Sequence, residues 1–340
     1  MVTLKDIARE TGLNFRSVSQ VLHGSHRYSP TTQKRVREVA QRLGYRPNAV
    51  ARSMARGKTH CIGYVGHSLR APLTMEKVEV IATQAQQMGY HLFLAGANEE
   101  GNRALEREII EELLARRVDG LIINIIPESD LSFYLSLQKQ GIPLVLTGHH
   151  SKPAGLPMVT VDIEGGVYEA TRHLLDLGHR DLALAFGEYA VRSPHNRLDG
   201  CRKALQERGI SLAAGRVFDD RPGTIEAICR YTKDQLGQSP RPTAIIFNSD
   251  EMAFAGLRVI REMGLEIPRD VSVVGVDDLP LAENTWPPLT TVRQPRAELG
   301  RAALELLMKQ IRGEDIRGQK RILLPTALVV RQSTGPAQIR

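Results

Sequence analysis

Residues 2–22 read VTLKDIARETGLNFRSVSQVL, and this stretch decides the fold of the N-terminal part of the chain. Its first apolar positions follow helical spacing behind a capping box that begins at Thr3. Gly12 suits the left-handed conformation that ends a helix, and Asn14 is a favourable N-cap for a second helix over residues 15–22. Two helices joined by a short turn that contains glycine predict a helix-turn-helix.

A third helix is expected to begin after Ser29, with Pro30 at its first position and Gly44 at its end. In such a unit the second helix enters the major groove of DNA. Four of its side chains are expected to read base edges: Phe15, Arg16, Ser19 and Gln20. For Phe15, packing in the core is the competing interpretation. Short polar groups and helix starts are expected to contact phosphates: Thr3, Asn14, Ser17, His23, Ser29 and Thr31.

Residues 46–48 break the helical pattern, because the residue before Pro47 disfavours the helical conformation. Residues 49–56 are long enough only for a marginal helix, which is expected to order on DNA or on a partner. Met54 is an apolar group in a basic segment and suits a wedge between base pairs in the minor groove. We therefore expect a DNA-contacting hinge here, through Asn48, Ala51 and Met54.

The distribution of charge supports a polyanion-binding head. The chain has a net charge of +7. Its first 60 residues hold 12 basic and three acidic residues, whereas the remainder has a net charge of −2. A small basic head on a near-neutral body is typical of a nucleic-acid-binding protein. The chain has no long apolar run and no apolar N-terminal stretch of the signal-peptide kind, so a cytoplasmic location without membrane association is expected.

From Cys61 onward, strand-like apolar runs alternate with helical stretches. These runs lie at 61–66, 91–96, 119–126, 143–148, 158–162, 181–187, 243–248 and 271–278. Such alternation predicts parallel sheets that are covered by helices on both faces. The fold class is therefore α/β: an all-α helix-turn-helix headpiece followed by two doubly wound parallel-sheet lobes. A ligand is expected between the lobes, at the carboxyl ends of the strands.

The expected boundaries follow from this pattern. They are a DNA-binding domain at 1–47, a hinge helix or linker at 48–59, a body at 60–333 and a short tail at 334–340. Within the body, lobe one is expected to comprise 60–160 plus 289–319, and lobe two 161–288 plus 320–333. The cysteines Cys61, Cys201 and Cys229 are scattered, which predicts reduced, buried residues and neither a metal site nor a cofactor.

The motifs resemble the lactose-repressor/galactose-repressor family of bacterial regulators over nearly the whole chain. The resemblance rests on ordered segments such as VTLKDIARETGL, LGYRPNAVARSM, EATRHLLDLGHRDLALAFG, NRLDG, NSDEMAFAGLRVI, DVSVVGVDD and PPLTTVRQP. It implies a periplasmic-binding-protein-like body, a homodimer, a pseudo-palindromic double-stranded operator and a small-molecule effector, most often a sugar or a sugar derivative. The protein would then be a transcriptional repressor controlled by that effector.

The resemblance also implies roles for single residues. Phe15, Arg16 and Gln20 match base-reading positions, although Gln20 and His23 replace the residues usual there. Met54 matches the intercalating hinge position. The implied effector contacts are Leu73, His149, Ser193, Asn196, Arg197, Ser249, Asp250 and Asp277. Leu73 stands where an aromatic residue often stacks on a sugar ring, which weakens the case for a plain hexose. For His149, a surface position is an equal alternative.

Three other classes of protein share some of these features. A sugar-processing or nucleotide-dependent enzyme is disfavoured because no GxGxxG, GxxxxGK[ST], GxSxG or HExxH motif occurs. A periplasmic solute-binding protein would explain the body but not the basic head, and it requires a signal peptide. An architectural DNA-binding protein would explain the head but would leave two large lobes without a role.

Overall fold

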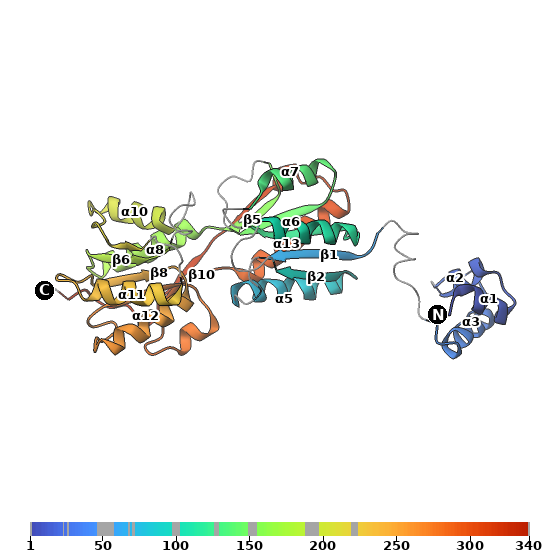
Figure 1. The fold of residues 1–340 in the computed structure, drawn as a ribbon, viewed down its shortest axis with the longest axis horizontal. Helices are drawn as coiled ribbons and strands as arrows, with labels where there is room; N and C mark the ends of the chain where they lie inside the picture. Colours follow the sequence, from blue (N-terminus) through green and yellow to red (C-terminus); the bar gives the residue numbers. More distant parts are fainter. Residues whose placement is uncertain are drawn as a thin grey trace. The chain divides into compact units, whose positions relative to one another are not determined.

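The computed structural model describes most of the chain, and the chain divides into two compact units, Met1–Thr59 and His60–Arg340 (Figure 1). The described residues are 2–22, 24–25, 27–45, 58–66, 69, 72–96, 103–125, 129–148, 155–187, 197–218 and 224–338. Among these residues, no helix is both long and apolar enough to cross a membrane.

The first unit contains the three predicted helices, α1 (Leu4–Thr11), α2 (Phe15–Leu22) and α3 (Pro30–Arg42). One small core joins them, formed by the buried residues Ile7, Val18, Val21, Val36 and Ala40. The expected start and stop signals are confirmed. The Asn14 side chain accepts a hydrogen bond from the Ser17 amide, Ser29 caps α3, and Gly12 ends α1 at φ +66°.

The first sheet of the body has the order β11-β5-β4-β3-β1-β2 and is parallel throughout. Its strands are β1 (Cys61–Gly66), β2 (His91–Gly96), β3 (Gly120–Ile125), β4 (Leu144–Gly148), β5 (Met158–Val161) and β11 (Arg321–Leu324). Helices α5 (Pro72–Gln87) and α13 (Arg296–Ile311) contribute to the core on one face. Helices α6 (Arg103–Ala115) and α7 (Leu131–Lys139) contribute to the core on the other. This first lobe is therefore doubly wound, as predicted.

The second sheet has the order β12-β10-β9-β8-β6-β7, and only the pairing of β12 with β10 is antiparallel among its described pairings. Its strands are β6 (Leu182–Ala185), β7 (Val217–Phe218), β8 (Ala244–Phe247), β9 (Ser272–Asp277), β10 (Thr290–Arg293) and β12 (Ala327–Val329). Short 3-10 helices lie at Pro280–Asn284 and Arg317–Gln319.

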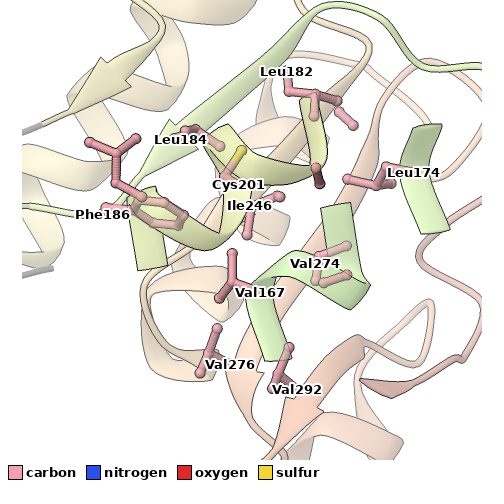
Figure 2. Close-up of a cluster of buried hydrophobic side chains, with 14 of the residues drawn as sticks. Val167, Leu174, Leu182, Leu184, Phe186, Cys201, Ile246, Val274, Val276 and Val292 are labelled. Atoms are coloured by element: carbon pink, nitrogen blue, oxygen red, sulfur yellow. The ribbon is translucent and has the colours of Figure 1, made fainter. Parts of the chain in front are cut away.

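Helices cover both faces of this second sheet as well. Helices α8 (Ile163–Asp176) and α10 (Arg197–Glu207) close the core that Figure 2 shows. Helices α11 (Ile225–Leu236) and α12 (Asp250–Glu262) close the core on the opposite face. Cys201 is buried in the first of these cores, as predicted, whereas Cys61 and Cys229 are only partly buried, contrary to prediction.

The C-terminal segments correct the predicted lobe boundaries. Residues 290–293 were expected in lobe one, but β10 pairs with β9 in the second sheet. Residues 321–324 were expected in lobe two, but β11 pairs with β5 in the first sheet. Both strands are four residues long, so their apolar pattern does not specify which sheet they join. The expectation that residues 296–311 join lobe one is confirmed, because Leu299, Ala303 and Leu307 lie in its core.

Candidate DNA-reading surface and effector site

Helix α2 presents its polar face to solvent and its apolar face to the core. Val18 and Val21 are fully buried, whereas the Phe15 side chain is 55% exposed and Arg16 is also exposed. The competing interpretation of Phe15 as a core residue is therefore wrong. An exposed aromatic ring next to an exposed guanidinium group is suited to contacts with base edges, since a fork of N–H donors matches guanine and an apolar side chain matches the thymine methyl group.

Two further positions on α2 are half-buried, Ser19 and Gln20. The Tyr28 hydroxyl donates a hydrogen bond of 2.8 Å to Oε1 of Gln20, which holds the amide group in one orientation. A held amide loses less conformational freedom when it pairs with a base. The sequence did not point to Tyr28 as a support for this residue, because the two side chains meet only when α2 and the loop before α3 pack together.

The candidate phosphate contacts lie at helix starts. Thr3 donates through its amide and its hydroxyl to the Asp6 carboxylate, over 2.9 and 2.7 Å. Ser29 accepts a hydrogen bond from the Thr32 amide. Thr3, Asn14, Ser29 and Thr31 are exposed, and Ser17 is half-buried. His23, Asn48, Ala51 and Met54 lie outside the described residues.

In the second lobe, polar side chains gather where three parallel strands end. Arg197 begins α10, and its Nε donates to the backbone oxygen of Asn248, just after β8, over 3.1 Å. Asp277 is the last residue of β9 and accepts a hydrogen bond of 2.6 Å from Nε2 of Gln294, just after β10. Burial raises the pKa of Asp277 to about 7, against the opposing charge of Arg197. The Oδ1 atom of Asn248 is buried and has no hydrogen-bond partner among the described residues.

This cluster combines a cation, an acid and two amides, which is a suitable set for a polyhydroxylated ligand. Arg197 and Asp277 were predicted from the sequence, and the structure brings them together. Asn248 and Gln294 were missed. Their position was a signal, because both are polar residues that directly follow a strand. Asn248 follows β8, and Gln294 follows β10.

Ser249 and Asp250 were also expected to contact the effector, but both are engaged in the fold. Ser249 caps α12 through a hydrogen bond from the Met252 amide. Asp250 is fully buried, and its carboxylate accepts from the Leu279 amide over 2.7 Å and from the Thr291 hydroxyl over 2.5 Å. These contacts tie α12 to β10 and favour a structural role for Asp250.

The neighbouring Asp278 joins three segments of the second lobe. It accepts hydrogen bonds of 2.6 Å from both Arg293 and Arg331. Burial opposes ionisation, but these two arginines lower the pKa of Asp278 below its ordinary value. Asp277 and Asp278 both have a positive φ, of 124° and 56°. The backbone strain at this strand end is held in place by these ionic contacts.

In the first lobe, the strand ends carry a second polar cluster. Leu73, predicted as an effector contact, is half-buried in the first turn of α5. One turn later Lys77 is buried, and its Nζ donates to Oδ1 of Asn124 in β3 over 2.7 Å. The Thr147 hydroxyl in β4 also donates to this Oδ1, over 3.1 Å. Lys77 was not predicted as a site residue, although its place on an apolar stripe, four residues from both Leu73 and Ile81, was a signal. His149, Ser193 and Asn196 lie outside the described residues.

Arg296, at the start of α13, links the two lobes. It donates to the backbone oxygens of Asp277 and Asp278 over 2.7 and 2.9 Å, and its Nε lies 2.6 Å from Oε2 of Glu76 in α5. The carboxyl end of β9 therefore lies within the reach of one arginine side chain from the first turns of α5. Both polar clusters lie beside this link.

Comparisons with known proteins agree with this organisation. Residues 3–48 match the family described as bacterial regulatory proteins, lacI family, and residues 171–334 match a periplasmic binding protein-like domain. Catabolite control protein A of Priestia megaterium is 31% identical over 98% of this chain and 99% of its own length. The HTH-type transcriptional repressor PurR of Photobacterium profundum is 31% identical over 98% of each chain.

Solved structures extend the likeness to the complete fold. The lac repressor dimer bound to operator and the anti-inducer ONPF superposes with a TM-score of 0.85, at 28% identity and over 98% of this chain and 99% of that one. The complex of the transcriptional regulator CelR with cellobiose has a TM-score of 0.70, at 29% identity and over 98% of this chain and all of that one. With relatives above 30% identity along almost its full length, this chain belongs to the lacI family of bacterial regulatory proteins.

Proposed function

We propose that this protein is a transcriptional repressor that binds a pseudo-palindromic operator as a homodimer and releases or engages it in response to a small-molecule effector. The observation that carries the DNA-binding part is the solvent-facing pair Phe15 and Arg16 on α2, in a headpiece that holds the excess positive charge of the chain. Phosphate contacts from the basic headpiece supply affinity, and contacts from α2 supply specificity.

We further propose that the effector is a sugar or a sugar derivative and that it binds between the lobes. Related structures carry ONPF, cellobiose and, in a regulator from Enterococcus faecium, ribose. In this chain Arg197, Asp277 and Gln294 supply donors and acceptors for hydroxyl groups. Turnover of the ligand is not part of the proposal, because the named relatives are regulators and no catalytic motif occurs.

Coupling between ligand and DNA requires that the ligand bind two lobe arrangements with different affinity. Arg296 is suited to couple the two lobes, because it contacts Asp277 of the second lobe and Glu76 of the first at the same time. A ligand that changes the position of the β9 end would change this link. The proposed site of action is the cytoplasm, where the operator is accessible.

The DNA-binding part is tested by selecting binding sites from random duplexes and measuring affinities for the selected operator and for each single-base variant. Arg16→Ala is expected to cost about 1–3 kcal/mol and to relax specificity at one base pair. Arg9→Ala is the matched control, since Arg9 is an exposed arginine on α1 and its loss removes the same charge. An equal loss on every sequence with both variants would remove Arg16 from base recognition.

The effector part is tested by thermal shift of the full chain against sugars, sugar acids, sugar phosphates, nucleosides and purines. A ligand at 100 times its Kd stabilises by about 2.7 kcal/mol. Arg197→Ala is expected to abolish the response. Arg202→Ala, an exposed position on the same helix α10, is expected to preserve it. An unchanged response in Arg197→Ala would exclude Arg197 from the site.

A further inference from the structure

Lys77 is a buried amine of the first lobe that has no role in the proposed function. Its side chain is 5% exposed, and its Nζ contacts two neutral groups, Oδ1 of Asn124 at 2.7 Å and Oγ1 of Thr147 at 3.5 Å. The same Nζ lies 5.7 Å from the centre of the Tyr64 ring. Buried charges in proteins are normally paired with an opposite charge, so a lysine that meets only neutral groups is unusual.

Two carboxylates at the link between the lobes, one of them adjacent to Lys77 in sequence, have other partners. Glu76 pairs with Arg296, and Asp277 lies under the influence of Arg197. Among the described residues, the hydrogen-bond contacts of the Lys77 Nζ are with the neutral side chains of Asn124 and Thr147, and no ion pair with a carboxylate is present. Burial alone lowers the pKa of Lys77 to about 7, with no compensating acid. Within the described part of the chain, this amine therefore has no acidic group that would neutralise its charge.

The surroundings of Lys77 lie at the binding end of the sheet. Asn124 and Thr147 are the fifth and fourth residues of β3 and β4, and therefore lie near the carboxyl ends of these strands. Tyr64 is completely buried, its ring lies against Gly66 at the end of β1, and its hydroxyl has no hydrogen-bond partner among the described residues. The amine, 5.7 Å from the centre of the Tyr64 ring, and the Tyr64 hydroxyl thus both lack a full set of partners among the described residues, which makes an incomplete polar site.

We propose that Lys77 binds an anionic group of the effector, a carboxylate or a phosphate, with the Tyr64 hydroxyl as a second donor. This inference rests on the proposed effector function and names the ligand class, an acidic sugar derivative. The ammonium group supplies a point charge, which suits either anion. Leu73, one turn before Lys77, offers no aromatic face to a sugar ring, so charge rather than stacking distinguishes the ligand at this end of the site.

The test uses full-length protein and pairs of compounds that differ in one anionic group. The carboxylate arm compares D-gluconate with D-glucitol and D-galacturonate with D-galactose. The phosphate arm compares glucose 6-phosphate with glucose and ribose 5-phosphate with ribose. We expect the anionic member of at least one pair to raise the melting temperature and to bind at least tenfold more tightly than its neutral partner. The arm in which this occurs identifies the anion.

Variants at Lys77 then assign the effect to this residue. Lys77→Met is expected to reduce the affinity for the anionic compound at least tenfold, whereas Lys77→Arg retains the preference. Lys139→Met, an exposed lysine of α7 in the same lobe, is the control. If Lys77→Met does not fold, the anionic and neutral pairs on the unmodified protein decide the question.

Preference for the neutral members, a response to no member of either arm, or an undiminished preference in Lys77→Met would overturn the proposal. Failure of the proposed function is distinguishable from failure of this inference. A protein that binds neutral sugars and selected operator DNA retains the function but loses the anion site. A protein that binds no DNA sequence in preference to others contradicts the proposed function itself.

Discussion

Replacing Lys77 by methionine is expected to stabilise the folded protein. Burial lowers the pKa of this amine from 10.5 to about 7. Because one pH unit corresponds to about 1.4 kcal/mol, keeping the buried amine protonated below pH 7 costs the folded state roughly 5 kcal/mol. Methionine preserves an unbranched apolar stem without the charge. Loss of the contacts with Asn124 and Thr147 offsets about 1–3 kcal/mol, which leaves a net gain of about 2–4 kcal/mol.

The gain depends on pH with a defined sign. The pKa of Lys77 in the folded chain lies below that in the unfolded chain, so the unfolded chain binds more protons between about pH 7 and 10.5. The unfolding free energy of the unmodified protein therefore rises with pH across this window. In Lys77→Met this pH-dependent contribution to the unfolding free energy is absent. Its advantage is expected to be largest below pH 7, to disappear at about pH 9 and to become a deficit of about 1–3 kcal/mol as pH approaches 10.5.

The assay is urea unfolding followed by circular dichroism at pH 6 and pH 9, with thermal melts in parallel. At pH 6 the variant is expected to melt about 5 °C above the unmodified protein, since about 2 °C corresponds to 1 kcal/mol for a unit of this size. Lys139→Met is expected to change stability by less than about 0.5 kcal/mol. A Lys77→Met variant that is destabilised at pH 6, or an advantage of equal size at both pH values, would refute the reasoning. A gain in stability together with a loss of ligand response would show that this charge is retained for binding.

Three other predictions concern the second lobe. Gly200→Ala is expected to lower the unfolding free energy measured in urea by about 1–3 kcal/mol, because its Cβ would lie 2.2 Å from the backbone oxygen of Glu164 where α10 crosses α8. An unchanged unfolding free energy would mean that the two helices move apart at no cost. Arg216→Met is expected to cost about 3–5 kcal/mol in unfolding free energy, because Asp181 loses a two-point ion pair with a buried guanidinium group; a loss below 1 kcal/mol would contradict this. Burial lowers the pKa of His179, and both ring nitrogens are engaged. Stability should therefore fall as pH decreases below about 6.5, and His179→Gln should flatten that slope in melts from pH 7 to pH 5.

The candidate base-reading positions on α2 were accessible from the sequence because local physics places them. The exposed face of α2 follows from its helical period, whereas Arg197 and Asp277 were assigned through the resemblance of NRLDG and VGVDD to the lactose-repressor/galactose-repressor family. Asn248, Gln294 and Lys77 were not identified. Their place in the candidate site depends on which strand ends meet, and neither composition nor spacing encodes that arrangement directly. Ser249 and Asp250 were assigned to the ligand, but their side chains are occupied in capping α12 and in holding β10.

The sequence by itself determined the three helices of the head, most of the strand and helix positions of the body, and the concentration of positive charge in the first 60 residues. These properties depend on periodicity, capping and composition, which act over a few neighbouring residues. Only the tertiary structure decided that β10 belongs to the second sheet and β11 to the first. It also decided that Lys77 is buried against Asn124 and that Arg296 joins the lobes. These contacts connect residues far apart in the chain, and packing of the whole body selects them.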